Sequence, residues 1–300
     1  MKKKAVLVIH GGTGAMPDAR RLRRIRRRLR EICAQAHRAL EGGAGAVEAA
    51  VLAVRLMEDD ALFNAGTGSA LQRDGRARMS ASVMDGARMR FAGVLNIERV
   101  RNPVEAAKAL LEEEDRILAG PQALAYARSL GLGDWDPVTP SRRRELKKHL
   151  DRPCVRSKGR AITGELHRAP QMVSGTGYRV EGTVGAVALD REGRLAAATS
   201  TGGKSAARPG RVSDSGLPVG NYADEHVAVS CTGLGEQIAE DGLAIRIAQQ
   251  VRDGVAPARA FRDTFRWLKS RGRRAGAIAL DARGRSAWDT TLPALFVEAR

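Results

Sequence analysis

The chain has 300 residues, and 43% of them are hydrophobic, so it can bury a substantial core and is not a disordered protein. Lys and Arg number 51 against 34 Asp and Glu, and the resulting net charge of +17 favours anionic partners at low salt. Aromatic residues make up only 4% and do not alternate with the basic ones, so a base-stacking surface for nucleic acid is not indicated. Three cysteines without a CxxC pair exclude a disulfide framework and a cysteine zinc site.

From the residues at the start of the given sequence we expect no targeting signal. Three lysines are followed by only five apolar residues, Ala5–Ile9, which is too short for a signal peptide. A membrane-spanning helix needs about 20 apolar residues, and no stretch approaches that length. We therefore expect a soluble, cytoplasmic protein that does not contact a membrane.

The first 130 residues have the pattern of mixed strands and helices. Apolar residues recur every three or four positions from Leu22 to Ala36, which predicts an Arg-rich helix with one buried stripe, ended by Gly42. In chain order we expect a strand at Ala5–Ile9, helices at Asp18–Leu40 and Val47–Met57, a hairpin of Ala77–Met84 and Met89–Ile97, and helices at Pro103–Glu114 and Pro121–Leu130.

The stretch from about residue 131 to 182 differs from the rest. Four prolines interrupt it, and Gly, Ser and Thr are frequent, which predicts a flexible linker. After it we expect strands at Thr183–Asp190 and Leu195–Ser200, helices near Leu234–Val251 and at Pro257–Ser270, and strands at Ala275–Leu280 and Leu295–Glu298.

The pair Gly182-Thr183 allows two interpretations. A Thr hydroxyl becomes a good nucleophile when a base lies beside it, and a freed amine on the same residue supplies that base. This requires backbone cleavage just before Thr183. Locally, however, the pair is more typical of a simple strand start, because Thr favours strands.

Blocks spread along the whole chain decide between these interpretations. The first half contains Ile9-His10-Gly11-Gly12-Thr13-Gly14, Leu62-Phe63-Asn64-Ala65-Gly66, Val83-Met84-Asp85-Gly86 and Arg101-Asn102-Pro103. The second half contains Gly182–Asp190, Ala196–Gly203, Gly210–Ser215 and Ala228–Gly233. In these blocks and their order the chain resembles the plant-type (type III) L-asparaginase and isoaspartyl peptidase family of N-terminal nucleophile (Ntn) hydrolases.

This resemblance implies an α+β fold, a four-layer αββα sandwich of the Ntn-hydrolase type, built by residues 1–300 as one domain. It implies autocleavage between Gly182 and Thr183 into an α subunit, residues 1–182, and a β subunit, residues 183–300. The implied assembly is a homodimer of processed αβ units. The implied activity is hydrolysis of L-asparagine and of β-aspartyl dipeptides through an ester on the N-terminal Thr.

Functional residues follow from the resemblance position by position. Thr183 matches the nucleophile, Thr201 the residue that orients it, and Asn64 a neighbour of the nucleophile. Thr232 and Gly233 match the oxyanion donors, and the substrate-binding positions are Arg211, Asp214, Gly233 and Gly235. A strand-end hydroxyl for Thr201, a helix start at Thr232-Gly233 and a surface ion pair of Arg211 with Asp214 are the structural alternatives.

The loop from Met57 to Thr67 resembles the family's sodium loop, and we expect no organic cofactor. The implied sodium ligands are backbone carbonyls, namely those of Met57, Glu58, Asp60, Phe63, Ala65 and Thr67. Cys33 and His37 lie four residues apart on one helix, but two ligands without partners favour packing over a metal site.

The sequence departs from the family around the implied substrate loop. Ser80 stands where an Asp is common, Ser213 replaces a usual glycine, and Gly220-Asn221-Tyr222 replaces Gly-Cys-Tyr. These changes leave the preference between asparagine and isoaspartyl dipeptides open. The alternatives are a glycosylasparaginase-like or threonine-endopeptidase-like Ntn hydrolase and, in another class, a basic protein that binds nucleic acid through Arg20–Arg30.

Overall fold

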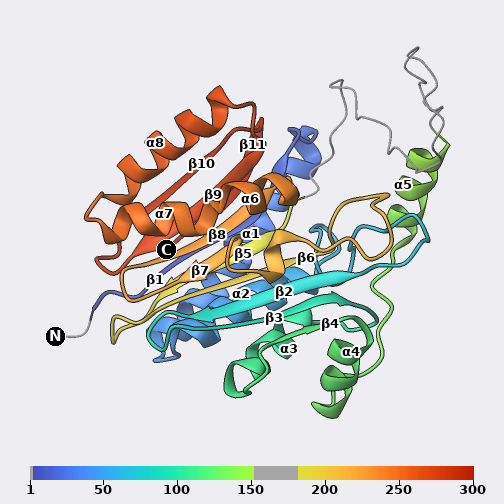
Figure 1. Ribbon diagram of the computed structural model, residues 1–300, viewed down its shortest axis with the longest axis horizontal. Coiled ribbons are helices and arrows are strands. Elements are labelled where there is room, and N and C mark those ends of the chain that lie inside the picture. Colours follow the sequence, from blue (N-terminus) through green and yellow to red (C-terminus); the bar gives the residue numbers. More distant parts are fainter. Residues whose placement is uncertain (1–2, 152–181) are drawn as a thin grey trace.

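The computed structural model describes residues 3–151 and 182–300, which form a mixed α+β protein (Figure 1). The helices are α1 (Ala19–Glu41), α2 (Ala46–Glu58), α3 (Pro103–Ala109), α4 (Gly120–Ser129), α5 (Pro140–Leu150), α6 (Gly235–Asp241), α7 (Leu243–Arg252) and α8 (Pro257–Ser270), with 3-10 turns η1 (Leu110–Glu112) and η2 (Asp214–Gly216). The strands are β1 (Val6–Gly14), β2 (Met79–Asp85), β3 (Arg90–Ile97), β4 (Ile117–Ala119), β5 (Val184–Leu189), β6 (Leu195–Thr201), β7 (Asn221–Ala223), β8 (Val227–Gly233), β9 (Ala275–Asp281), β10 (Ser286–Thr290) and β11 (Ala294–Ala299).

The strands in the described ranges form two sheets. One has the order β11-β1-β5-β6-β2-β3-β4 and is antiparallel except for the parallel pair of β3 and β4. The other has the order β10-β9-β8-β7 and is antiparallel throughout. Strand β5 lies near the middle of the larger sheet, between β1 and β6.

Three apolar clusters hold the sheets and helices together. Val184, Ala186 and Ala188 of β5 pack in a cluster with α1, α2 and α3, whereas Val187 and Leu189 pack toward Ala228 and Ile278 of the smaller sheet. This alternation follows from the two-residue period of a strand, which sends successive side chains to opposite faces. A third cluster packs β8 and β9 against α7 and α8, on the side of the smaller sheet seen at the upper left of Figure 1.

Most expected elements are present, but the linker prediction was wrong in part. Residues 140–150 form helix α5, in which Pro140 occupies the first turn and the Thr139 side chain caps the Arg142 N–H. Proline fits there because its missing N–H would have no helical partner. The remainder of that expectation, residues 152–181, lies outside the described residues.

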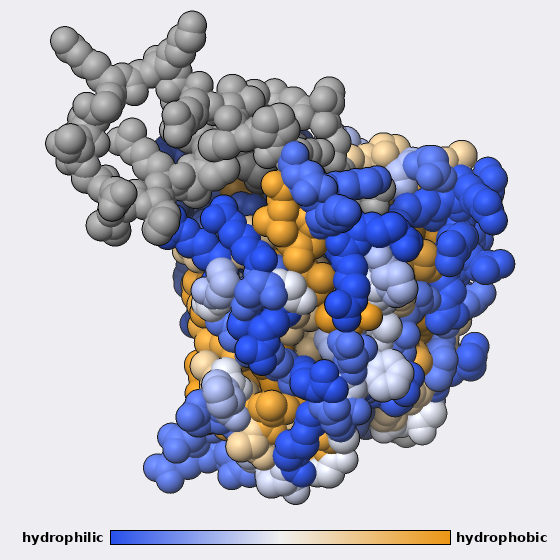
Figure 2. Space-filling view, turned by 90° about the vertical axis from the view of Figure 1, so that its right-hand side faces the viewer, coloured by the Kyte–Doolittle hydropathy of each residue, from blue (hydrophilic) through white to orange (hydrophobic). Residues whose placement is uncertain are grey.

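The surface is rich in charge. On the face seen in Figure 2 hydrophilic side chains predominate, with apolar side chains in patches between them. Among the helices of the described ranges, none has both the length and the apolar character needed to cross a bilayer.

Candidate active site

Thr183 lies immediately before β5, and its side chain is buried with 5% of the residue exposed. Val184 is the register partner of Ser200 in β6, and Thr201 is the partner of Ser80 in β2. Facing residues of an antiparallel pair share a face of the sheet. The register therefore brings Thr183, Thr201 and Ser80 to one end of three neighbouring strands.

Two glycines create room for the bond before Thr183. A Cβ atom on Gly12 would lie 2.7 Å from the Gly182 Cα, and Gly12 has a φ of +102° that favours glycine. A Cβ on Gly182 would in turn collide with the Gly12 backbone. The backbone of the block His10-Gly11-Gly12 thus packs directly against residue 182.

The hydroxyl of Thr183 has a defined partner. Its Oγ1 lies 3.0 Å from the Oγ of Ser215, which is fully buried in η2. His10 hydrogen-bonds the Thr183 backbone, and burial lowers the pKa of its imidazole to about 3, so the ring is neutral at pH 7. Its Nε2 lies 2.9 Å from the Ser230 Oγ.

Thr201, in contrast, uses its hydroxyl on its own loop. Its Oγ1 accepts the Gly203 N–H at 3.1 Å, a contact typical of a strand-end Thr. The side chain is 2% exposed and occupies the same strand end as Thr183. Thr201 can therefore be a strand-end hydroxyl, which was its structural alternative, and still lie where a residue that orients the nucleophile is expected.

Thr232 and Gly233 are the last two residues of β8, in the smaller sheet. The Thr232 Oγ1 is fully buried and is among the polar atoms without a hydrogen-bond partner in the described part of the chain. Leaving a buried hydroxyl unpaired costs about 1–3 kcal/mol, and such atoms in native proteins often serve a function. Gly233 has a φ of +141°, and a Cβ there would lie 2.5 Å from the Arg274 carbonyl oxygen.

Arg211, Asp214 and Gly235 meet at the start of α6. A Cβ on Gly235 would lie 2.6 Å from Asp214 Oδ1 and 2.9 Å from Arg211 Nη2. The structural alternative for these residues, a surface ion pair of Arg211 with Asp214, is absent from the contacts of the described residues: Arg211 instead donates to both oxygens of Glu236, at 2.7 and 2.9 Å. Hydrogen bonds from Arg211 lower the pKa of Glu236 to about 2.

Asp214 is a buried carboxylate with spare capacity. It is 4% exposed, its Oδ1 accepts the Ser213 hydroxyl at 3.0 Å, and its Oδ2 is buried without a partner among residues 3–151 and 182–300. Desolvation by burial raises its pKa to about 6, although the nearby Arg211 charge opposes the shift. An unpaired, water-excluded carboxylate oxygen is suited to receive a cation.

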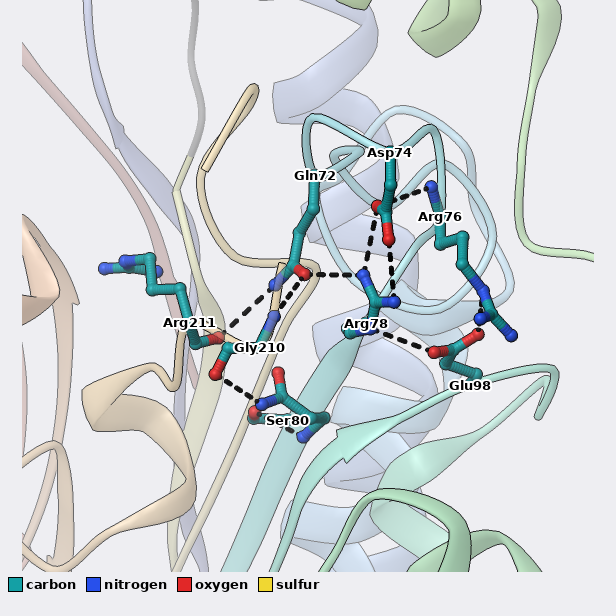
Figure 3. A network of polar contacts seen from close by, with 9 residues as sticks. Gln72, Asp74, Arg76, Arg78, Ser80, Glu98, Gly210 and Arg211 are labelled. Atoms are coloured by element: carbon teal, nitrogen blue, oxygen red, sulfur yellow. Dashed lines mark hydrogen bonds and ion pairs between the residues drawn. The ribbon is translucent and has the colours of Figure 1, made fainter. Parts of the chain in front are cut away.

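A polar network holds the backbone that carries Arg211 (Figure 3). Gln72 donates to the Arg211 carbonyl at 3.4 Å and accepts the Gly210 N–H at 2.9 Å. Arg78 bonds Gln72 and Asp74 and pairs with Glu98. The guanidinium of Arg211 points away from this network, so the loop is fixed by its backbone while the charged group pairs with Glu236 outside the network.

Asn64 links two loops beside this end of the sheet. Its Nδ2 donates to the Gly203 carbonyl at 2.7 Å, and its Oδ1 accepts the Ala70 N–H at 2.8 Å. Its backbone carbonyl accepts the Gly202 N–H at 2.8 Å. Asn64 therefore joins the Met57–Thr67 loop to the turn that follows Thr201.

The Met57–Thr67 loop is curled rather than extended. The Thr67 N–H donates to the Glu58 carbonyl at 2.7 Å, and Gly66 has a φ of +50°. The carbonyls of Met57, Glu58 and Asp60 each accept a backbone N–H within this turn, which leaves each oxygen one lone pair for a further ligand. Within residues 3–151 and 182–300, no group of three or more His, Cys, Asp and Glu side chains is arranged for a metal.

Two polar partners in this region were missed from the sequence, Ser215 and Glu236. Each lies one residue after a recognised position, and only the fold brings Ser215 to Thr183 and Glu236 to Arg211. Ser80, which stands in place of an Asp, accepts the Asn96 N–H at 3.4 Å. Cys33 is buried among apolar side chains, and the ring of His37 lies against Ala5, in agreement with packing roles.

A buried Thr hydroxyl and an unpaired buried hydroxyl beside a glycine are compatible with the nucleophile and the oxyanion donor of an amide hydrolase. The family model described as "Asparaginase" matches residues 3–300. The chain is 41% identical over 290 residues to the isoaspartyl peptidase/L-asparaginase of Synechocystis, covering 97% of this chain and 86% of that protein. It is 36% identical over 297 residues to the isoaspartyl peptidase of Escherichia coli, covering 94% and 88%.

A third relative is the plant-type L-asparaginase of Pyrococcus furiosus, 36% identical over 257 residues, with 83% of this chain and 80% of that protein covered. The chain belongs to the asparaginase family. The resemblance drawn from the sequence blocks is thereby confirmed.

Proposed function

We propose that this protein is a self-processing amidohydrolase that converts L-asparagine to aspartate and ammonia and cleaves β-aspartyl dipeptides. The observation that carries the proposal is that the Thr183 hydroxyl contacts Ser215 of η2, next to Asp214, whose carboxylate lies beside Gly235. The relatives are named isoaspartyl peptidase and L-asparaginase, and these names support β-aspartyl dipeptides and L-asparagine as the two substrates.

In this proposal Thr183 is the nucleophile. After cleavage of the Gly182–Thr183 bond, the free amine of Thr183 takes the hydroxyl proton while Oγ1 attacks the side-chain amide carbon of the substrate. The C–N bond then breaks with proton transfer to the leaving nitrogen, and ammonia or an amino acid departs. Water hydrolyses the remaining β-aspartyl ester and restores the hydroxyl. Thr201 orients the nucleophile from the adjacent strand end.

Thr232 and Gly233 would stabilise the negative oxygen that develops during attack. The buried Thr232 hydroxyl has a hydrogen bond to give, and its burial makes such a bond stronger than in water. A fixed donor of this kind costs no reorganisation at the moment of reaction.

Arg211 and Asp214 would hold the α-amino acid end of the substrate, next to Gly235. Glu236 occupies the Nε and Nη2 edge of Arg211, and a guanidinium has five N–H donors, so Arg211 retains N–H groups for the α-carboxylate. The unpaired Oδ2 of Asp214 would accept from the α-ammonium. Asn64, beside the turn after Thr201, would help to fix the wall of this site.

At the level of fold and assembly we propose a four-layer αββα sandwich of the Ntn-hydrolase type, formed by one domain and cut into residues 1–182 and 183–300. The packing of helices on both outer sides of two apposed sheets supports it. We further propose a homodimer of such processed units in the cytoplasm.

The curled Met57–Thr67 loop fits a sodium ion, because hard cations prefer oxygen ligands and the loop gathers backbone carbonyls. The carbonyls of Met57, Glu58, Asp60, Phe63, Ala65 and Thr67 would hold it. Bound there, the ion would supply a fixed positive charge that rigidifies the loop carrying Asn64.

The test is hydrolysis by the purified protein. Ammonia release from L-asparagine and leucine release from β-aspartyl-leucine should both depend on Thr183 and be abolished in Thr183→Ala. Glutamine, one methylene longer, should be a poor substrate. Activity on both substrates that survives in Thr183→Ala would refute the proposed function.

A further inference from the structure

A row of buried hydroxyl groups connects the Thr183 hydroxyl to the Asp214 carboxylate. The Thr183 Oγ1 lies 3.0 Å from the Ser215 Oγ, which lies 3.2 Å from the Ser213 Oγ, which donates to Asp214 Oδ1 at 3.0 Å. All four residues are at most 6% exposed. We call this row the hydroxyl relay.

The protons of the relay have only one arrangement when Asp214 is ionised. A carboxylate accepts only, so Ser213 must donate its single proton to Asp214. Ser213 then accepts from Ser215, and Ser215 accepts from Thr183. Every hydroxyl proton therefore points from Thr183 toward Asp214.

The uncleaved chain lacks the base that the mature site would use. Before cleavage the nitrogen of Thr183 is an amide, which cannot take a proton from the hydroxyl, so another group must activate Oγ1. His10 lies by the Thr183 backbone, but burial lowers its pKa to about 3, which makes its imidazole a weak base, and its Nε2 is engaged with Ser230. Among the described side chains, the hydroxyl relay connects Thr183 Oγ1 through two hydroxyl groups to the carboxylate of Asp214, which can accept the proton.

We propose that Asp214, acting through Ser213 and Ser215, is the base for self-processing of the precursor. This inference rests on the proposed function, because it concerns the Gly182–Thr183 cleavage that creates the active enzyme.

The proton transfers balance without any co-reactant except water. The Thr183 proton moves to Ser215, the Ser215 proton to Ser213 and the Ser213 proton to Asp214, while Oγ1 forms a bond to the Gly182 carbonyl carbon. Asp214 then gives this proton back through Ser213 to Ser215, and Ser215 passes it to the Thr183 nitrogen as the C–N bond breaks, which leaves an ester. Water hydrolyses that ester to a Gly182 carboxylate and a free Thr183 amine and hydroxyl.

The position of the relay is fixed by its surroundings. The Ser215 carbonyl accepts the Ser82 hydroxyl from β2 at 2.7 Å, and the Ser215 N–H donates to the Ser213 Oγ at 3.3 Å. Ser213 has extended backbone angles, φ −96° and ψ 154°, which a β-branched residue also adopts. A Thr would therefore fit at position 213 and keep the hydroxyl.

Few charges act on Asp214. Arg211 from the same loop stabilises its ionised form, Glu236 from α6 opposes it, and the buried Cys231 thiol of β8 is the other titratable neighbour. Strand β6 contains no ionisable side chain. Strands β2 and β3 contact η2 through Ser82 and Gly93, and neither of these residues carries a charge. Tyr222 of β7 lies by Asp224 and Arg252 instead. With its pKa raised to about 6, Asp214 changes charge within an accessible pH range.

The experiment follows processing in freshly made full-length chain. Protein from cell-free synthesis is transferred to buffers between pH 5 and 8, and the first-order rate of appearance of the two fragments is measured on denaturing gels. The parent rate should rise about fivefold from pH 5 to pH 6 and level off above pH 7, as the ionised fraction of Asp214 does. Ser213→Ala and Ser215→Ala should slow cleavage at least tenfold and lose this pH dependence.

Two further variants separate the relay from general loss of packing. Ser213→Thr keeps the hydroxyl and should restore both rate and pH profile. Thr264→Val removes a buried hydroxyl in α8 that accepts from Gln250, far from the relay in the fold, and should cleave at the parent rate. Circular dichroism checks that each variant folds.

The outcomes distinguish this inference from the proposed function. If Ser213→Ala and Ser215→Ala cleave at the parent rate with the parent pH profile, the relay is wrong while the enzyme assignment stands. If Ser213→Thr behaves like Ser213→Ala, the hydroxyl is not the operative group and the relay is again wrong. If the parent never cleaves, self-processing itself fails.

Discussion

Glu236 holds the guanidinium of Arg211 through two parallel hydrogen bonds, at 2.7 and 2.9 Å. Arg211 has a side chain 15% exposed, whereas that of Glu236 is 50% exposed. The pair therefore orients a sheltered cation from its solvent side, and the Nη2 atom of this cation also lies beside Gly235, next to Asp214.

The first prediction concerns this pair. Glu236→Ala should raise the KM for L-asparagine about tenfold with little change in kcat, because Arg211 loses its fixed orientation while the reacting groups are untouched. Steady-state ammonia release measures both constants. A fall in kcat at unchanged KM would contradict the orienting role.

Glu236 also contributes to acid stability. Its pKa is lowered from 4.5 to about 2 in the folded chain, so the stabilisation is present above pH 4.5 and is lost as the pH falls toward 2. Because the pair is half exposed, we expect only about 0.5–1 kcal/mol. Urea unfolding of parent and Glu236→Gln should differ at pH 6 and converge near pH 2.

A further prediction concerns Asp214, whose pKa is raised in the folded chain, whereas that of Glu236 is lowered. Its pKa rises from 3.8 to about 6 on folding, so the folded state binds more protons than the unfolded state in this window and loses stability as the pH rises through it. In chains kept uncleaved by Thr183→Ala, Asp214→Asn should therefore raise the free energy of unfolding at pH 7 by about 1–3 kcal/mol and leave it similar at pH 4. It should nevertheless bind substrate poorly. A variant less stable than the parent at pH 7 would contradict the claim that burial destabilises the ionised form of Asp214 in the folded chain.

Thr232→Val is expected to separate catalysis from stability. The hydroxyl has no partner in the fold, so its removal should leave Tm unchanged or raise it. Loss of an oxyanion donor should lower kcat by about 10²–10³. Thermal melts and steady-state kinetics of fully processed protein measure the two effects. Undiminished kcat would remove Thr232 from the oxyanion site.

Gly235→Ala tests the substrate site by filling it. The new methyl group would lie 2.6 Å from Asp214 Oδ1 and 2.9 Å from Arg211 Nη2, in the space assigned to the α-amino acid end. We expect a rise in KM of at least tenfold. Gly133→Ala is the matched control, because a Cβ there meets nothing within 4 Å. Equal kinetics for both variants would place the substrate elsewhere.

Local patterns predicted much of the fold. The range Pro257–Ser270 agrees with α8 at both ends, because its apolar positions, an N-terminal proline and Gly272 after its end all point to one helix. Strand β10 was missed because its residues are mostly half-exposed and polar, so it lacks an alternating pattern. Helix α5 was missed because Pro140 was taken as an interruption, whereas it begins the helix.

The candidate site was predictable only where residue identity matched a known pattern. Thr183, Thr232 and Asp214 were recognised from blocks of sequence, and the fold brings these blocks to one region. The partners Ser215 and Glu236 depend on contacts between segments 32 and 25 residues apart, which no local pattern encodes. The pKa of Asp214 likewise depends on burial, which its neighbours in the sequence do not reveal.

The central claim is that Thr183 becomes the N-terminal residue of a second chain by its own chemistry. Intact-mass analysis with N-terminal sequencing, applied to purified parent and Thr183→Ala, tests it most directly. The parent should yield fragments 1–182 and 183–300, the second beginning with Thr183, whereas Thr183→Ala should remain one chain of 300 residues without asparaginase activity. Cleavage of Thr183→Ala at the same bond, or an uncut parent that hydrolyses asparagine at full rate, would contradict the account.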